Sequence, residues 1–266
     1  MKLRFSRKSL AVPYVLFLVL FVILPILIIV YYAFTDANGN FTFSAFVSFF
    51  TDPNKLSVLF TSLLMGLANT AICLLISYPI AYILANPRLN KNAILVTLFV
   101  VPMWINFVLR TGATRDLLAA IGLNGGEHPL TATMIGMAYN YMPFTVLPLY
   151  STMLKLDKAQ VEAAKDLGCN PTQVFYKNII PQTIPGIVSA AQMTFMPTMS
   201  SYVISDTMSE GKLMLFGNSI YLSFSLSDWN SGSFMSLVML VIIFVSMLAT
   251  RKFTRNEAYV RGGGLW

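Results

Sequence analysis

Long stretches without any charged residue alternate with short charged segments along this chain. A transmembrane helix needs about 20 predominantly apolar residues and tolerates few ionised groups. Six stretches fit this pattern, and we expect a membrane-spanning helix in each of them: residues 9–35, 56–87, 92–109, 129–154, 178–205 and 229–250. The third stretch holds only 18 residues, near the lower end of the spanning range of about 17 to 25.

A seventh stretch, residues 213–227, is shorter and contains Gly217, Asn218 and several hydroxyl side chains. It is too short and too polar to cross the hydrocarbon core. We expect an interfacial or re-entrant segment that lies outside the core, and the sequence leaves the choice between these two open.

The composition supports a chain surrounded largely by lipid. Hydrophobic residues make up 56% of the sequence and charged residues only 11%, whereas soluble domains average about 25% charged. We therefore predict an all-α integral membrane protein with six transmembrane helices.

The basic residues predict the orientation of these helices. With six spans, 14 of the 18 lysines and arginines share one side, so the positive-inside rule places both termini in the cytoplasm. This asymmetry explains the net charge of +7 without a nucleic-acid partner. The four basic residues on the other side are Lys55, Arg110, Arg115 and Lys212.

The most informative polar segment is the predicted cytoplasmic loop at residues 155–179. Asp157 with Gln160 forms a capping-box pattern that opens a short helix, and Gly168 is placed to end that helix in the left-handed conformation. Asn170, with a proline next and a glutamine three residues on, begins a second helix. The pattern predicts a helix, a glycine turn and a helix.

The first helix of this loop has one small apolar face surrounded by charged residues. Ala159, Ala163, Ala164 and Leu167 share the face, and Glu162 lies on its rim. A small face allows another backbone to approach closely. The pattern therefore predicts a docking surface for a partner. The alternative is an amphipathic helix that lies on the inner leaflet.

The same loop resembles the EAA loop of the membrane subunits of binding-protein-dependent ABC importers. Glu162, Ala163, Ala164, Gly168 and the later Pro181 match that motif in letter and spacing. Two positions depart from it, because Asn178 stands where isoleucine is usual and Ile180 where leucine is usual. The resemblance implies that Glu162, Ala163, Ala164 and Gly168 couple the chain to a separate ATPase subunit.

The resemblance extends over essentially the whole chain to the spermidine/putrescine (PotB-like) permease family, through residues 101–112, 162–168, 202–221 and Asp228-Trp229. It implies the type I ABC importer (MetI-like) permease fold. The implied domains are a cytoplasmic head, first helix and external segment at residues 1–55, a five-helix core at 56–250, and a cytoplasmic basic tail at 251–266.

The family resemblance also implies partners in the cytoplasmic (inner) membrane. These are an ABC ATPase subunit dimer, a second permease subunit (PotC-like) and an extracytoplasmic polyamine-binding protein. The chain carries no G-x-x-x-x-G-K-[ST] loop, so ATP hydrolysis must come from a partner and the chain itself is not an enzyme. Its single histidine, His128, has no partner at ligand spacing, and we expect no metal and no cofactor.

A polyamine passing through a pore would need a carboxylate, an amide and aromatic faces. The candidates for such a pathway are Asp206, Gln192, Tyr202, Trp104 and Asp228. Gln192 and Asp206 fall on one helical face with Met196, Met199 and Val203. The alternatives are that Asp206 caps a helix end and that Trp104 packs against lipid.

Seven of the eleven carboxylates lie on the predicted external side, which makes that mouth acidic. A polycation would be drawn to it, although a depletion of basic residues outside leaves such an excess by default. No ionisable residue lies in the central turns of any span, which disfavours a proton-coupled, stand-alone secondary transporter. A permease for another small solute of the same importer class is a further alternative.

Overall fold

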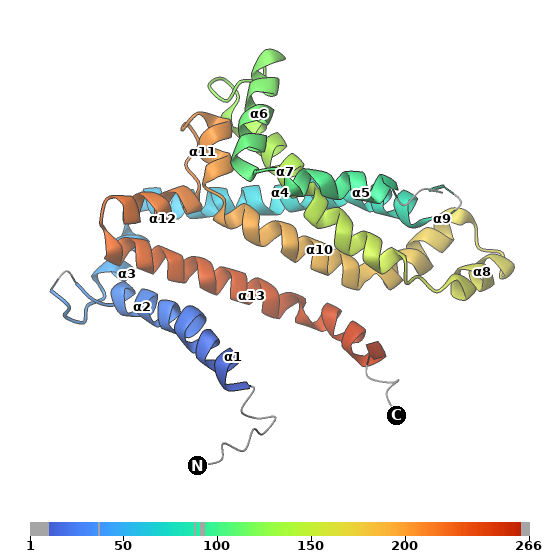
Figure 1. The fold of residues 1–266 in the computed structure, drawn as a ribbon, viewed down its shortest axis with the longest axis horizontal. Coiled ribbons are helices and arrows are strands. Elements are labelled where there is room, and N and C mark those ends of the chain that lie inside the picture. The colour runs from blue at the N-terminus through green and yellow to red at the C-terminus, as the bar shows by residue number, and fades with distance from the viewer. Residues whose placement is uncertain (1–10, 37, 88, 91–93, 262–266) are drawn as a thin grey trace, which may run out of the picture. The chain divides into compact units, whose positions relative to one another are not determined.

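The computed structural model describes residues 11–36, 38–87, 89–90 and 94–261, and these residues are almost entirely helical (Figure 1). Within these ranges there is no β-strand, and the one β-bridge pairs Thr35 with Phe41. The predicted all-α fold class is confirmed. The basic head at residues 1–10 and the last five residues of the predicted tail lie outside the described residues.

The helices follow the predicted stretches in chain order. The first part of the chain contains α1 (Ala11–Leu18), the π-helical turn η1 (Val19–Ile23), α2 (Leu24–Ala33), α3 (Ser44–Thr51), α4 (Pro53–Ala85), α5 (Ile94–Val100), the 3-10 turn η2 (Val101–Trp104) and α6 (Phe107–Ala120). The second part contains α7 (Pro129–Met153), α8 (Lys158–Asp166), α9 (Pro171–Val174), the π-helical turn η3 (Phe175–Ile179), α10 (Ile180–Ser200), α11 (Val203–Ser209), α12 (Phe216–Ser225) and α13 (Trp229–Arg261).

Three helical segments in the described chain are long and apolar enough to cross a membrane: Ala11–Ala33, Pro53–Ala85 and Trp229–Arg251. A fourth is possible if Ile94–Trp104 and Phe107–Ala120 form one span, but these two segments meet at a bend of 99°. The helices α7 and α10 have 25 and 21 residues, which suffices in length but not in apolarity. Six spans are therefore not confirmed as a set.

The chain divides into two compact units. One unit joins the residues up to 57 with residues 219–242. Its core is aromatic, because the ring of Phe234 lies 5.6 Å from that of Phe49 and 6.5 Å from that of Phe34. The amide of Asn230 donates a hydrogen bond of 3.0 Å to the carbonyl of Tyr32 and so ties the start of α13 to the end of α2.

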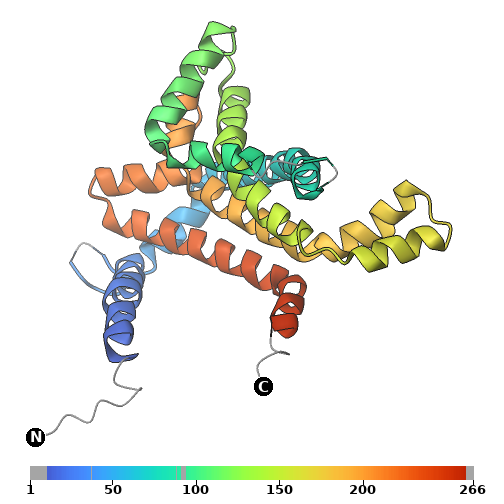
Figure 2. The ribbon, with the colours of Figure 1, turned by 45° about the vertical axis from the view of Figure 1, so that its right-hand side comes forward.

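The other unit comprises residues 58–218 and the segment that follows residue 242. In it α7 and α10 run side by side, and α8 and α9 lie at their far ends (Figures 1 and 2). Buried hydroxyls link the two long helices, since the Oγ1 atoms of Thr145 and Thr194 lie 2.7 Å apart. Such bonds hold helices together where lipid supplies no hydrophobic driving force.

This division does not test the predicted domain boundaries. Those boundaries describe the order of head, core and tail relative to a membrane, whereas the two units group residues by their contacts. The division at 1–55, 56–250 and 251–266 stays a prediction. The predicted interfacial or re-entrant segment contains α12, a helix of 10 residues, which is about 15 Å long and too short to span the hydrocarbon core.

Candidate coupling and substrate-pathway sites

The loop between α7 and α10 folds as the predicted helix, turn and helix. The carboxylate of Asp157 accepts hydrogen bonds from the backbone N–H groups of Ala159 and Gln160 and so caps α8. A full capping box joins Asn170 and Gln173 at the start of α9. The predicted reciprocal bond from Gln160 is not part of the Asp157 cap, which uses the aspartate side chain alone.

Gly168 closes α8 with a left-handed backbone, at φ +81°. The N–H of Cys169 donates to the carbonyl of Ala164, and the N–H of Gly168 donates to that of Lys165. These two bonds form a Schellman motif, which satisfies carbonyls at the end of the helix. A side chain at Gly168 would meet no atom within 4 Å, so the backbone conformation, not the space, calls for glycine.

The predicted coupling residues lie on the surface of α8. Glu162 and Ala163 are exposed and Ala164 is half-buried. All three lie on α8, and the turn at Gly168 follows the end of this helix. Beneath this helix is a cavity of about 320 Å³, lined by residues of α8 and by the ends of α4 and α7, including Tyr82, Met153, Leu156, Val161, Glu162 and Ile179.

Asn178 has a role that the sequence pattern did not indicate. Its side chain accepts a hydrogen bond of 2.7 Å from Gln182 and donates one of 3.5 Å to the carbonyl of Gln160. Gln182 in turn accepts from the backbone N–H of Asp157 at 3.1 Å. The residue that departs from the usual isoleucine therefore ties α8 to the start of α10.

The predicted continuous face from Gln192 to Asp206 is wrong, because the helix that would carry it is broken. α10 ends at Ser200, Ser201 is extended, and α11 begins at Val203. Met199 is 1% exposed and belongs to the core, and the amide of Gln192 donates to the hydroxyl of Thr250 on α13. The proline-rich span predicted as one helix thus presents Asp206 on a separate short helix.

Asp206, Tyr202 and Trp104 are exposed. The N-cap of α11 is Tyr202, and in the part of the chain that the structure describes the carboxylate of Asp206 makes no hydrogen bond or ion pair. The proposal that Asp206 merely caps a helix end is therefore not supported. Trp104 is 87% exposed at the end of η2, and Asp228, in the other unit, accepts a hydrogen bond of 3.1 Å from the N–H of Ser231.

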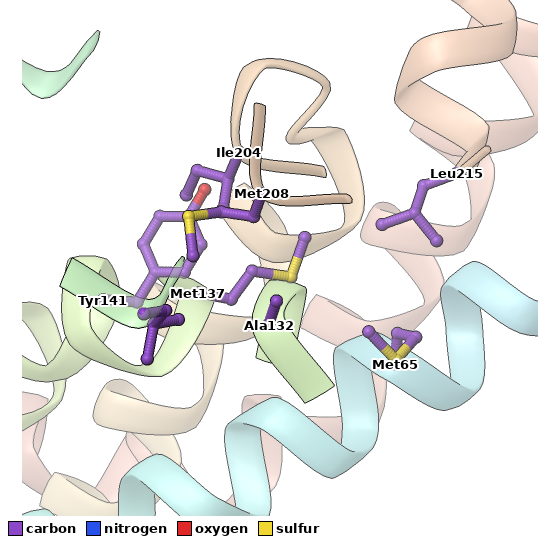
Figure 3. Packing of buried hydrophobic residues seen from close by; sticks show 8 residues of the cluster. Met65, Ala132, Met137, Tyr141, Ile204, Met208 and Leu215 are labelled. Atoms are coloured by element: carbon purple, nitrogen blue, oxygen red, sulfur yellow. The ribbon is translucent and has the colours of Figure 1, made fainter. Parts of the chain in front are cut away.

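α11 is held by a methionine-rich core. Met208 is fully buried and packs with Met137 and Tyr141 of α7 (Figure 3). A side chain on Gly136 would approach Met208 to 2.7 Å, so α7 and α11 are in close contact at this point. This packing fixes the short helix that carries Asp206. Among the described residues no group of three or more histidines, cysteines or carboxylates could hold a metal ion.

The described helices include segments long and apolar enough to cross a membrane, which is the architecture of an integral membrane protein. Residues 2–257 match the family described as the binding-protein-dependent transport system inner membrane component. The chain belongs to this family, and it is a multi-pass inner-membrane permease subunit.

Curated relatives cover nearly the whole chain. The spermidine/putrescine transport system permease protein PotB of Escherichia coli (strain K12) is 34% identical over 251 residues, which are 87% of this chain and 91% of that protein. PotB of Salmonella typhimurium (strain LT2) is 35% identical over 251 residues, with coverage of 87% and 88%. PotB of Haemophilus influenzae is 30% identical over 277 residues, with coverage of 95% and 96%.

Solved structures show the same fold. A bacterial alginate ABC transporter in complex with an alginate pentasaccharide-bound periplasmic protein has a chain that matches with a TM-score of 0.65 at 15% identity, covering 93% of this chain and 94% of that one. A second structure of an alginate importer matches with a TM-score of 0.63 at 16% identity, covering 93% and 95%. These matches confirm the permease fold.

Proposed function

We propose that this chain is the transmembrane permease subunit of an ATP-driven importer that carries spermidine and putrescine into the cell. The observation that carries the proposal is the similarity to the PotB permeases, which extends over 87% to 95% of the chain. The exposed carboxylate of Asp206 supports it, because a polyamine is a chain of ammonium groups and a carboxylate is their natural partner.

Uptake by the complete transporter tests the substrate. Cells that lack polyamine import would express this chain together with its ATPase, second permease subunit and receptor, and uptake of labelled spermidine and putrescine would be measured. ATP-dependent uptake that unlabelled polyamine suppresses is the expected result. Normal assembly with transport of a different solute would identify another importer of this class, and transport without any ATPase would revive the secondary-transporter alternative.

For the cytoplasmic side, we propose that α8 docks into a separate ABC ATPase dimer. Glu162, Ala163 and Ala164 would form the contact, and Gly168 would set the direction in which α8 leaves the loop. The exposure of Glu162, Ala163 and Gly168 supports the assignment. A second, PotC-like permease subunit and an extracytoplasmic polyamine-binding protein complete the proposed assembly.

For the external side, we propose that Asp206, Tyr202 and Trp104 contact the polyamine as it enters. Aromatic faces bind ammonium groups through the ring quadrupole, and Asp206 would supply the opposite charge. Asp228 would add acidic charge at the mouth. Gln192 is the weakest member of the predicted set, because its amide already donates to Thr250.

This assignment requires both termini and α8 to lie in the cytoplasm. Cys169, which follows Gly168 directly, is a native reporter, because Cys73, the other cysteine, is buried. An impermeant thiol reagent should label Cys169 in lysed cells and leave it unlabelled in intact cells. In a Cys169→Ser background, Ile121→Cys on the exposed end of α6 should be labelled in intact cells. The reverse pattern would overturn the orientation.

A further inference from the structure

Arg110 is a buried cation that the substrate path and the coupling loop leave unexplained. It lies in the first turn of α6 and is only 8% exposed, although the sequence pattern alone counted it among the external charges. A guanidinium is always charged, and burying it is costly unless its donors are satisfied. A buried arginine in a membrane protein is therefore expected to have a defined task.

The guanidinium of Arg110, on α6, connects α7 with the turn η2 that precedes α6. Its Nε donates a hydrogen bond of 2.8 Å to Oδ1 of Asn140 on α7. Its Nη1 donates to the backbone carbonyl of Pro102 in η2. The guanidinium carbon also lies 5.8 Å from the centre of the Tyr139 ring, within the range of a cation–π contact.

None of these partners is negatively charged, and no described carboxylate forms an ion pair with Arg110. The planar fork of donors, and not charge neutralisation, is thus what the site uses. Asn140 is itself held in place, because its Nδ2 donates to the carbonyl of Gly136 at 2.8 Å. Arg110 therefore anchors the carbonyl of Pro102 to a fixed point on α7.

That carbonyl lies next to a sharp bend in the chain. The segments before and after it meet at 99°, and η2 ends two residues after Pro102, at Trp104. The Trp104 side chain is 87% exposed, so its own packing cannot fix its position. The bond from Arg110 restrains the backbone two residues before this indole, and the side chain of Asn106, two residues after it, caps the start of α6.

We propose that Arg110 is a positioning residue for the substrate path: by holding the Pro102 carbonyl against α7 it fixes the bend between η2 and α6 and presents Trp104 to the polyamine. The part of this inference that concerns Trp104 rests on the proposed function. The part that concerns the bend does not.

The bend can be tested without substrate. In the complete transporter with Cys169→Ser, the exposed Ile105→Cys position would be labelled with a maleimide that shifts this subunit on a gel. Arg110→Gln should change the labelling rate at Ile105→Cys by about tenfold, the factor expected when one charge-assisted hydrogen bond is lost. Labelling at Ile121→Cys, at the other end of α6, should stay unchanged. Equal labelling rates at Ile105→Cys with and without Arg110→Gln would overturn the proposal that Arg110 fixes the bend.

Uptake kinetics separate positioning from folding. Arg110→Gln should raise the apparent KM for spermidine by about tenfold with little change in the maximal rate per assembled complex. Arg110→Lys should have an intermediate effect, because one ammonium cannot reproduce the fork. The matched control is Arg115→Gln, since Arg115 lies on the same helix, its side chain is 43% exposed, and its ion-pair partner is the neighbouring Asp116. A lower maximal rate and lower abundance at an unchanged KM would make Arg110 structural only.

A further variant keeps the inference testable if Arg110→Gln fails to assemble. Asn140→Leu removes the acceptor of the Nε bond, so it should reproduce the effect of Arg110→Gln on labelling and KM. If Arg110 acts through Trp104, the double variant Arg110→Gln/Trp104→Ala should be no worse than Trp104→Ala alone. Additive effects would overturn that link. If Trp104→Ala leaves uptake unchanged, the substrate contact of Trp104 is refuted, and the labelling experiment alone decides whether Arg110 fixes the bend.

Discussion

The turn between α8 and α9 and the break between α10 and α11 solve the same problem with different contacts. In both places two helices meet end to end and leave backbone groups without helical partners. At the α8–α9 turn, Gly168, Cys169 and Asn170 satisfy these groups by hydrogen bonds that span at most five residues. Gly168 and Asn170 are exposed, and Cys169 is half-buried.

At the α10–α11 break the partners come from distant parts of the chain. The amide of Asn218 donates to the carbonyl of Tyr202 at 3.3 Å and accepts from the hydroxyl of Ser205. Ser62, 154 residues before Phe216, accepts the N–H of Phe216 at 2.7 Å and so fixes the segment that carries Asn218. Asn218 and Ser62 are both buried.

This difference has a mechanical consequence. A turn closed by its own residues can follow a moving partner without disturbing the rest of the fold, whereas a break closed by buried side chains moves only with the core around it. The α8–α9 turn therefore suits the transmission of a movement, and the α10–α11 break suits a fixed presentation of Asp206.

The largest expected effect comes from removing the centre of the α10–α11 break. Asn218→Ala removes three buried or partly buried hydrogen bonds, to the Tyr202 carbonyl, from the Ser205 hydroxyl and from the N–H of Leu215. We expect the free energy of unfolding to fall by about 2–4 kcal/mol and little assembled protein to remain. Thermal unfolding of the purified transporter and its abundance in the membrane would measure the loss. The matched variant Asn170→Ala removes an exposed cap and should cost only about 1 kcal/mol. Equal losses at the two asparagines would contradict the comparison.

The second effect should be large on transport and small on stability. Gly168→Val places a β-branched residue at φ +81°, which costs about 1–2 kcal/mol and redirects α8. We expect spermidine uptake to fall by more than about tenfold while ATP hydrolysis no longer responds to substrate and abundance stays unchanged.

Gly122 provides the control for this variant. It also has φ +81°, and a side chain there would also meet no atom within 4 Å. Gly122→Val therefore introduces the same backbone strain far from α8 along the chain, and it should leave coupling intact. Normal coupling in Gly168→Val, or equal uncoupling by both variants, would refute the docking role of α8.

The same comparison explains what the sequence could predict. The caps at Asp157 and Asn170 and the glycine turn at Gly168 are local patterns, and a local pattern carries its whole cause within a few residues. The role of Asn218 depends on Tyr202 and Ser205, which are separated from it along the chain, and the burial of Arg110 depends on Asn140, 30 residues away. Periodicity predicted a helix that continued through Ser201, because it carries no information on the distant contacts of Asn218 that hold the break.

The third prediction concerns the carboxylate that the break presents. Asp206→Asn keeps the size of the side chain and removes its charge, so we expect the KM for spermidine uptake to rise by about three- to tenfold without loss of assembly. Glu127→Gln is the control, because Glu127 is exposed on the predicted external side and lies outside the proposed path. Similar small effects at both positions would leave only electrostatic steering of the polycation.

The smallest expected effect tests whether the local turn is as independent as its contacts indicate. Asn178 joins α8 to α10 through the carbonyl of Gln160 and the amide of Gln182, and Asn178→Ile replaces both bonds by the side chain that is usual in the importer family. The bond to Gln160 is long, at 3.5 Å, and all three residues are at least partly exposed to water. The free energy of unfolding should therefore fall by only about 0.5–1 kcal/mol. Uptake should fall by no more than about threefold, and the Tm of the transporter should fall by no more than about 4 °C. Gln160→Ala, which keeps the carbonyl that Asn178 bonds, is the matched control and should be silent. A loss of uptake as large as that of Gly168→Val would mean that α8 transmits movement through Asn178 to α10 and is not an independent turn.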